Sequence, residues 1–185
     1  MNKKIAIDFD GVIIDSIKYF YDNFASSKYA VESNVPDGGY VKLLLETVVP
    51  VTANAPLKDG VVETLKMLRN DGYKLFLVTG RGTLGKNFSQ EMIDAEINTA
   101  KKRLEKTGLV FDGEFWATSD KAQVCKDNGF TIMIEDEERS AQKLQDAGIF
   151  TLYFRRDTAP EIKGENIVEV GSWQKIYEII LKNRN

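Results

Sequence analysis

Two aspartates separated by one residue stand at the end of the first apolar run of the chain. Residues 4–7 (KIAI) lead directly into Asp8, Phe9 and Asp10, and Gly11 follows them. An apolar run that ends in acids is typical of a buried strand that delivers carboxylates to the edge of a sheet, so Asp8 and Asp10 would face the same way. Two carboxylates held close together repel each other, and either a raised pKa or a bound cation relieves this repulsion. The alternative is a strand whose end is acidic by coincidence.

Other side chains that could do chemistry follow later apolar runs or begin a helix. They are Thr79, Gly80, Lys121, Glu135 and Asp136. In sheets of parallel strands, ligands bind beyond the carboxyl ends of the strands, and this rule places the residues that follow strands beside Asp8 and Asp10. Alone, Thr79 is equally typical of a turn and Lys121 of a solvated helix surface. The acidic pair could equally belong to the first turn of a helix.

The amino-acid composition excludes several kinds of catalytic site. The 185 residues include no histidine, so Ser-His-Asp triads, His-Cys dyads and His-ligated zinc are excluded. The single cysteine, Cys125, cannot form an internal disulfide, and we expect it to be a small apolar residue on a helix. Any catalysis must therefore depend on carboxylates, lysines, hydroxyls and metal.

Charge and hydropathy also limit the partners that we expect. A net charge of -3 argues against a general binder of nucleic acid or of anionic membranes. No apolar run approaches membrane-spanning length, and the segment before Asp8 has too few apolar residues for a signal peptide. We therefore expect a cytoplasmic protein. The sequence does not indicate its oligomeric state.

Apolar segments alternate with amphipathic ones along most of the chain, which predicts a parallel sheet covered on both faces. After the first strand, strands are predicted at 73–78, 114–117, 131–134, 149–154 and 167–170. Helices are predicted at 17–29, 60–71, 89–106, 121–128, 138–147 and 173–181, with Asp59, Asp120 and Ser172 among their caps. The expected fold class is α/β, a Rossmann-like parallel sheet flanked by helices with the first strand at its centre.

Residues 16–56 interrupt this alternation after the first strand. Pro36-Asp37-Gly38-Gly39 predicts a turn, and residues 40–49 could form a short helix. We interpret 16–56 as a small helical cap inserted into a core made of 1–15 and 57–185. Tyr19, Tyr29 and Tyr40 are aromatic residues that could line a pocket beneath such a lid. An ordinary helical connection packed on the core is the alternative.

Taken together and in this order, the candidate residues resemble the four motifs of the haloacid dehalogenase superfamily of phosphohydrolases and phosphotransferases. The motifs read DFDGVIIDS, LFLVTGR, Lys121 within SDKAQVCK, and IMIEDEERSA. The resemblance spans residues 5 to about 148 and implies a small C1-type cap in the insertion. A looser similarity to deoxyribonucleotidase-type members favours a nucleotide or another compact phosphate monoester, such as a sugar phosphate, as substrate.

The resemblance implies a magnesium-dependent reaction. A phosphate monoester is a dianion, so an anionic nucleophile approaches phosphorus only if a cation neutralises the phosphoryl oxygens. Mg²⁺ would be held by the Asp8 carboxylate, the Asp10 backbone carbonyl and Asp136. Glu135 would be a further ligand, directly or through water.

The resemblance also implies a role for each remaining candidate. Asp8 would form an aspartyl-phosphate intermediate, and Asp10 would act as general acid and then general base. Thr79 and Gly80 would bind the phosphoryl group, in the case of Thr79 through its hydroxyl and backbone. Lys121 would balance the negative charge of Asp8 and the phosphate.

A phosphate-binding P-loop is the rival interpretation of residues 80–87. The stretch GRGTLGKN nearly matches GxxxxGK[ST] and follows an apolar strand, which would make the chain a nucleoside-triphosphate-binding protein. Asn87 replaces the hydroxyl that would ligate Mg²⁺, and this interpretation leaves Asp8 and Asp10 unexplained. A third possibility is a phosphate-binding module that keeps the carboxylates and Mg²⁺ but does not turn over.

Overall fold

A computed structural model of the chain describes residues 3–24, 47–83, 89–155 and 161–182. Its centre is a six-stranded parallel sheet in the order β3-β2-β1-β4-β5-β6. The strands are β1 (Lys4–Ile7), β2 (Lys74–Val78), β3 (Gly113–Phe115), β4 (Ile132–Glu135), β5 (Phe150–Tyr153) and β6 (Ile167–Glu169). Successive strands are added on one side of β1 and then on the other, so the strand order reverses between β1 and β4. The predicted fold class and the central place of the first strand are confirmed.

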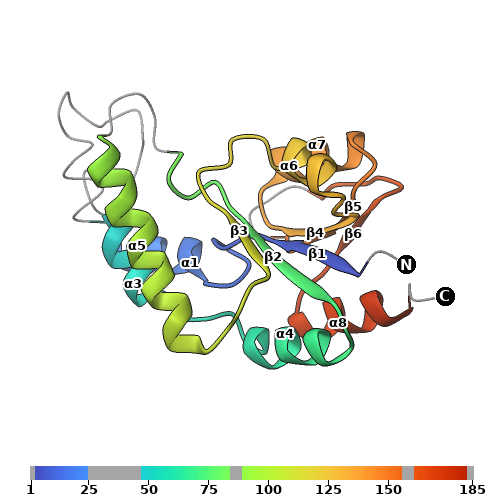
Figure 1. Cartoon of the computed structure of the whole chain (residues 1–185), viewed down its shortest axis with the longest axis horizontal. Coiled ribbons are helices and arrows are strands. Elements are labelled where there is room, and N and C mark those ends of the chain that lie inside the picture. Colours follow the sequence, from blue (N-terminus) through green and yellow to red (C-terminus); the bar gives the residue numbers. More distant parts are fainter. Residues whose placement is uncertain (1–2, 25–46, 84–88, 156–160, 183–185) are drawn as a thin grey trace.

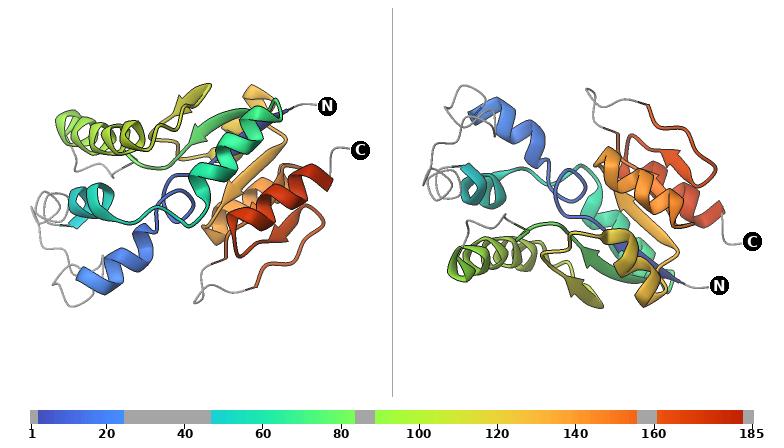
Figure 2. Two further views of the ribbon diagram at one scale, coloured as in Figure 1. Left: turned by 90° about the horizontal axis from the view of Figure 1, so that it is seen from below. Right: turned by 90° about the horizontal axis from the view of Figure 1, so that it is seen from above.

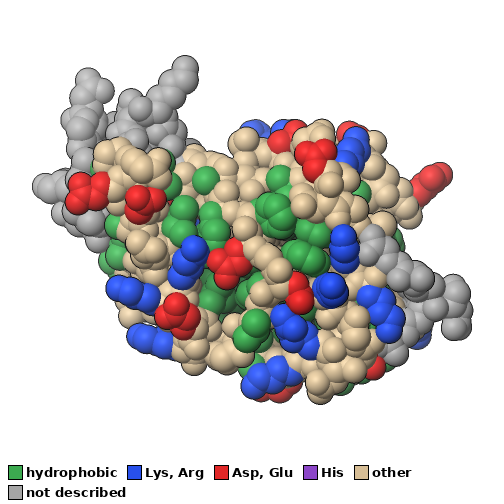
Figure 3. Space-filling model, in the orientation of Figure 1, with side chains coloured by type: hydrophobic (Ala, Val, Ile, Leu, Met, Phe, Trp, Pro, Cys, Tyr) green, Lys and Arg blue, Asp and Glu red, His purple; other side chains and the backbone are tan. Residues whose placement is uncertain are grey.

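Seven helices lie in the described part of the chain. They are α1 (Ser16–Phe24), α3 (Val49–Asn54), α4 (Val61–Asn70), α5 (Gln90–Thr107), α6 (Lys121–Asn128), α7 (Glu138–Asp146) and α8 (Trp173–Lys182). Helices α4 and α8 cover one face of the sheet and α6 and α7 the other, while α1, α3 and α5 form a group beyond one end of it (Figures 1 and 2). On the face drawn in Figure 3, side chains of both charges are scattered among hydrophobic ones. No helix among the described residues is long and apolar enough to cross a membrane.

Strand β1 is buried on both faces because successive side chains of a strand point in opposite directions. Ile5 and Ile7 belong to the same core cluster as α4 and α8, whereas Ala6 packs in the cluster that contains Cys125 of α6 and Leu144 of α7. This burial explains why the sequence of β1 is a continuous apolar run rather than an alternating one. Cys125 is a buried residue of a helix, as predicted.

Most predicted elements are present within a few residues of their predicted bounds, but one predicted cap is wrong. Helix α4 begins after Gly60, which has a left-handed backbone (φ 76°), and no side chain caps it. Asp59 therefore does not cap α4, because the chain enters the helix through a conformation that favours glycine. Asp120 and Ser172 cap α6 and α8 as predicted, and Ser89 caps α5: each of the three side chains accepts a hydrogen bond from a backbone N–H of the first turn.

The two connections to the predicted insertion lie side by side. Ile14 pairs antiparallel with Leu57, the Asp15 N–H donates to the Pro56 carbonyl at 2.8 Å, and the Lys58 N–H donates to the Ile13 carbonyl at 2.9 Å. The described ends of the insertion are helical, and α3 packs against α5. Residues 25–46, including Tyr29, Tyr40 and the predicted turn, lie outside the described residues. The division into a core and a cap stays a prediction.

Candidate functional site

A pocket of about 530 Å³ lies at the carboxyl ends of the central strands. Six of the seven candidate residues line it: Asp8, Asp10, Thr79, Gly80, Lys121 and Asp136. The position is the one expected for a ligand site in an open α/β sheet, because the strand order reverses between β1 and β4. Glu135 is fully buried next to this pocket and contacts Lys121. The structure thus brings together the residues that the sequence singled out.

Asp8 is held in one orientation by its backbone and by two contacts of its carboxylate. Its N–H donates to the Ile134 carbonyl at 3.0 Å, which extends the pairing of β1 with β4 by one residue. The Phe9 N–H donates to Asp8 Oδ1 at 2.8 Å, and Lys121 Nζ lies 2.8 Å from Asp8 Oδ2. The Asp8 carboxylate is therefore fixed before any ligand binds.

Lys121 forms ion pairs with two carboxylates, those of Asp8 and Glu135. Helix α6 begins at this residue because Asp120 caps it, and Lys121 Nζ lies 2.8 Å from Glu135 Oε2 as well as from Asp8. Burial alone would lower the pKa of Lys121, but the charges of Asp8 and Glu135 outweigh burial and raise it. The lysine is therefore a permanent cation at the site.

The surroundings of Glu135 disfavour its ionised form. Burial, followed by the charge of Asp8, raises the pKa of Glu135, and Lys121 offsets only part of this effect. Glu135 Oε1 also accepts from the N–H groups of Asp136 at 3.1 Å and of Glu137 at 3.0 Å. With both oxygens engaged, Glu135 orients the loop after β4 and supports Lys121.

Asp8, Glu135 and Asp136 together fit a divalent cation. Each offers a carboxylate oxygen, these oxygens lie within 4.8 Å of one another, and all three residues are buried. Two oxygens on one octahedral Mg²⁺ are about 3.0 Å apart when adjacent and about 4.2 Å apart when opposite, since each Mg–O bond is about 2.1 Å. Three acidic side chains this close together favour a bound cation, and carboxylate oxygens are the ligands that such an ion prefers.

Gly11 lets Asp136 approach the loop that follows β1. A Cβ atom at Gly11 would lie 1.9 Å from Asp136 Oδ2, and the backbone there is left-handed (φ 68°). The Gly11 N–H donates to Ser16 Oγ at 3.2 Å, which ties the loop to the start of α1. A side chain at this position would displace the Asp136 carboxylate as well as strain the backbone.

Thr79 and Gly80 form a tight turn at the end of β2. The Thr79 N–H donates to the Phe115 carbonyl at 3.0 Å, and Thr79 Oγ1 accepts from the Arg81 N–H at 3.1 Å. The Gly80 carbonyl accepts from the Thr83 N–H at 2.8 Å. Since the Thr79 N–H is already used, the hydroxyl is the group of Thr79 that can donate to a ligand.

Arg81 is a functional candidate that the sequence reasoning missed, although the residue lies within the quoted motif LFLVTGR. Its guanidinium forms a two-point ion pair with Asp10: Nε lies 2.7 Å from Oδ2, and Nη2 donates to Oδ1. Only 7% of the Arg81 side chain is exposed. An arginine placed directly after a strand, at the edge where several acids gather, was the available signal. Glu96, in the long polar helix α5, accepts from Arg81 Nη1 at 2.9 Å and had no comparable signal in the sequence.

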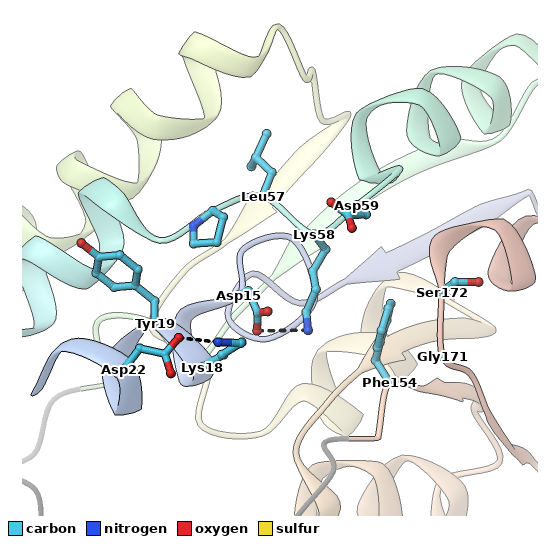
Figure 4. Close-up of a pocket in the computed structure, with 11 residues that line it drawn as sticks. Asp15, Lys18, Tyr19, Asp22, Leu57, Lys58, Asp59, Phe154, Gly171 and Ser172 are labelled. Carbon is cyan, nitrogen blue, oxygen red and sulfur yellow. Dashed lines mark hydrogen bonds and ion pairs between the residues drawn. The ribbon is translucent and has the colours of Figure 1, made fainter. Parts of the chain in front are cut away.

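A second pocket, of about 550 Å³, lies beside the two connections of the insertion (Figure 4). Lys58 Nζ lies 3.1 Å from Asp15 Oδ1 and 5.1 Å from the centre of the Phe154 ring. We call this second pocket the hinge pocket because it adjoins both connections. Tyr19 lines it and is not among the residues that line the pocket of Asp8. Of the three tyrosines suggested for the lid, the described one therefore faces the hinge.

Helix α5 begins too late for the P-loop interpretation. A P-loop lysine stands where the following helix starts, whereas α5 starts at Gln90 with Ser89 as its cap. Lys86 and Asn87 lie outside the described residues. Arg81, which would be a variable position of such a loop, is instead buried against Asp10.

Solved structures with this fold share little sequence with the chain. A Thermotoga maritima protein assigned as a β-phosphoglucomutase has a TM-score of 0.63 and 14% identity, covering 97% of this chain and 98% of that one. A haloacid dehalogenase-like family hydrolase from Xanthomonas campestris has a TM-score of 0.61 and 14% identity, covering 97% and 94%. The D,D-heptose 1,7-bisphosphate phosphatase of B. bronchiseptica, complexed with magnesium and phosphate, has a TM-score of 0.59 and 16% identity, covering 97% and 98%.

No protein-family model matches the sequence, and no curated protein matches it. The structural likenesses show that the chain has the fold of the haloacid dehalogenase superfamily, which confirms the resemblance at the level of the fold. The looser similarity to deoxyribonucleotidase-type members stays a prediction.

Proposed function

We propose that this chain, with its haloacid dehalogenase-like fold, is a Mg²⁺-dependent phosphohydrolase that acts on a small phosphate monoester through an aspartyl-phosphate intermediate. The observation that carries the proposal is the state of Asp8. Its carboxylate is buried, fixed by Phe9 and Lys121, and placed in a cluster of three buried carboxylates. A fixed anion beside a site that suits a divalent cation is what nucleophilic attack on a phosphate dianion requires.

In the first half of the reaction an Asp8 carboxylate oxygen forms a bond to phosphorus and the bond from phosphorus to the leaving oxygen breaks. Asp10 gives its carboxyl proton to that leaving oxygen. Lys121 and the Thr79 hydroxyl donate to phosphoryl oxygens as they gain charge. Gly80 lines the same pocket and leaves room for the phosphoryl group.

In the second half Asp10, now a carboxylate, takes a proton from water. The water oxygen bonds to phosphorus, the bond between phosphorus and Asp8 breaks, and phosphate leaves with Asp8 restored. Asp8, Asp136 and the Asp10 backbone carbonyl are the proposed ligands of Mg²⁺, and Glu135 supports them through Lys121 and the loop after β4. Bound Mg²⁺ would neutralise the phosphoryl oxygens and so reduce their repulsion of Asp8.

Residues 16–56 are the proposed cap that selects the substrate. The pocket beneath α1 is compact, which suits a nucleotide or a sugar phosphate better than a polymer. Substrate choice within that class is to be found by a screen of nucleotides and sugar phosphates, with Mg²⁺ and with EDTA. We expect turnover with Mg²⁺ and none with EDTA. Binding of inorganic phosphate with Mg²⁺, but no turnover of any substrate, would instead support the non-catalytic module.

Asp8→Asn tests the nucleophile. The amide keeps the shape of the carboxylate but is not an anion, so turnover should fall at least about 10⁴-fold while the melting temperature stays close to that of the wild type. Asp127→Asn is the matched control, because Asp127 is an exposed residue of α6 that bonds only Gln123 among the described contacts. Full activity in Asp8→Asn would refute the proposal.

Lys86→Ala tests the P-loop rival. This variant should keep most of the activity, and a loss of ATP binding in it would support the P-loop rival.

A further inference from the structure

Arg81 connects Asp10 to two helices of the group beyond the sheet. Besides its ion pair with Asp10, Arg81 Nη1 donates to Glu96 Oε1 of α5 at 2.9 Å and to Thr52 Oγ1 of α3 at 2.5 Å. Thr52 Oγ1 in turn donates to the Val48 carbonyl at 2.8 Å, so this hydroxyl is used both as donor and as acceptor. Thr52 and Glu96 are both buried.

We propose that Arg81 is a positioning residue for Asp10, and that Glu96 and Thr52 fix Arg81, so that helices α5 and α3 determine where the acid–base carboxylate stands. This inference rests on the proposed function, in which Asp10 transfers a proton in each half of the reaction. Asp10 lies in the loop after β1, where its carboxylate is 27% exposed. Without a fixed partner, such a side chain would sample several rotamers.

The type of the residue supports a positioning role. A guanidinium that bonds both oxygens of a carboxylate fixes its plane as well as its distance, which a lysine ammonium cannot do. The ring of Phe9 lies under the guanidinium, 5.7 Å from Arg81 Cζ to the ring centre, and Phe9 is fully buried. The cation is therefore held between an aromatic wall and three oxygen-bearing side chains.

Glu96 is the anchor of this arrangement. A carboxylate that is only 2% exposed is costly to bury without a cation, and Arg81 supplies that cation at 2.9 Å. The Arg81 guanidinium thus bonds the deeply buried carboxylate of Glu96 on one side and the carboxylate of Asp10 on the other. Since α3 packs on α5, a displacement of either helix would be transmitted to Asp10 through Arg81.

The contacts of Arg81 argue against a direct role in binding phosphate. They occupy four of the five N–H groups that a guanidinium offers. A phosphate-binding arginine needs two adjacent free N–H groups for a two-point contact. We therefore expect variants of Arg81 to lower kcat rather than to raise KM.

Arg81→Lys tests the inference with two kinds of substrate. It keeps the charge but removes the two-point contact, so proton transfer by Asp10 should become inefficient. For an alkyl phosphate taken from the nucleotide and sugar phosphate screen, kcat should fall about 10²-fold with little change in KM. For p-nitrophenyl phosphate, whose leaving group departs without needing a proton, formation of the phosphoenzyme in a single turnover should fall less than about threefold.

Arg69→Lys is the matched control for loss of an Arg–Asp contact. Arg69 pairs with Asp112 at 3.0 Å and bonds the Val110 carbonyl at 2.9 Å, and it lines neither the pocket of Asp8 nor the hinge pocket. This variant should leave kcat on both substrates unchanged.

Two further variants weaken the contacts that fix Arg81. Glu96→Gln and Thr52→Val, which keep volume and remove one acceptor each, should reproduce the substrate-dependent loss of kcat seen in Arg81→Lys, with a smaller fold-change. They keep the test informative if Arg81→Lys folds poorly.

A double-mutant cycle with Asp10→Asn completes the experiment. If Arg81 acts through Asp10, adding Arg81→Lys to Asp10→Asn should cost no further phosphoenzyme formation from the alkyl phosphate in a single turnover, although Arg81→Lys alone slows that substrate about 10²-fold. Equal losses on both substrates, a raised KM, or additive losses in the cycle would overturn the positioning role while leaving the proposed function in place. Unchanged turnover in Asp10→Asn alone would instead overturn the acid–base role in the proposed function.

Discussion

Two pockets of this molecule have nearly the same volume but differ in how their charged side chains are paired and buried. The site pocket encloses about 530 Å³ and the hinge pocket about 550 Å³. In the hinge pocket each lysine has its own aspartate, and the Lys18–Asp22 pair is 70% and 55% exposed. At the site one lysine, 11% exposed, serves two carboxylates that are 6% and 0% exposed. Volume alone does not distinguish a reactive pocket from a surface hollow, whereas unbalanced buried charge does.

Solvent explains the difference between the two pockets. Water screens the exposed pairs at the hinge, so that each contributes little to stability and creates no demand for a ligand. At the site burial removes this screening, and burial together with the nearby charge of Asp8 raises the pKa of Glu135. Only the site pocket therefore has a physical reason to bind a divalent cation and then a phosphate.

Removal of Lys121 should have the largest effect on this contrast. In Lys121→Met the two buried carboxylates lose their shared cation, so the free energy of unfolding should fall by about 3–5 kcal/mol. The value of kcat/KM should fall about 10²- to 10³-fold, because a charge that stabilises the transition state is lost. Denaturant unfolding and steady-state kinetics measure both quantities. A loss below about 1 kcal/mol would mean that the site behaves like the hinge.

A methyl group at Gly11 tests how closely the loop after β1 approaches the Asp136 carboxylate. Gly11→Ala should displace Asp136 and weaken Mg²⁺ binding and activity about 10- to 100-fold. Gly148→Ala is the control, because Gly148 also has a left-handed backbone (φ 75°) but nothing within 4 Å of the new methyl group. Gly148→Ala should lower the melting temperature through backbone strain and leave Mg²⁺ binding and activity unchanged. Equal Mg²⁺ affinity in the two variants, measured by titration calorimetry, would refute the predicted crowding of Asp136.

The pH dependence of stability should reveal the buried anchor of Arg81. Burial raises the pKa of Glu96 above its ordinary value of 4.5, although Arg81 opposes this shift. A carboxyl group whose pKa is higher in the folded state binds protons more tightly there, so its contribution to stability is present below about pH 4.5 and is lost as the pH rises through the folded-state pKa. The melting temperature of the wild type minus that of Glu96→Gln should therefore decrease as the pH rises from 4.5. A difference that increases over this range would contradict the raised pKa.

The hinge pocket should show the smallest effect. Lys58→Met removes the partner of Asp15, but both side chains are about one quarter exposed. The free energy of unfolding should change by about 0–1 kcal/mol and kcat should stay within about twofold of the wild type. A large loss of kcat, measured on the best substrate of the screen, would mean that the ion pair at the hinge governs the site and would remove the contrast between the pockets.

The sequence predicted local features well because their causes are local. The apolar runs and the caps at Asp120 and Ser172 depend on residues that are close together in the chain. The grouping of Asp8 with Thr79, Glu135 and Asp136 followed from a general rule about the edges of parallel sheets, whereas the place of Lys121 beside Asp8 was implied by the family resemblance. Interactions across the fold were not predictable in this way.

Arg81 shows why the rest was missed. Its partners Asp10 and Thr52 lie 71 and 29 residues away, and no local pattern reports which helix will pack beside the turn after β2. The cap of α4 was missed for a different reason, because the backbone angle at Gly60 decides it and Asp59 is equally compatible with a cap by type. Tertiary packing and individual backbone angles are the information that propensity does not contain.

The antiparallel pairing of Ile14 with Leu57 has a consequence for how this fold can diversify. The chain departs from the core and returns to it at adjacent points, about 5 Å apart as in any paired strands. A segment attached in this manner can lengthen, shorten or be exchanged at small entropic cost without altering the register of the sheet. Any substrate selectivity of the proposed cap can therefore change as a replaceable module, while Asp8 and Lys121 remain anchored by β1 and α6.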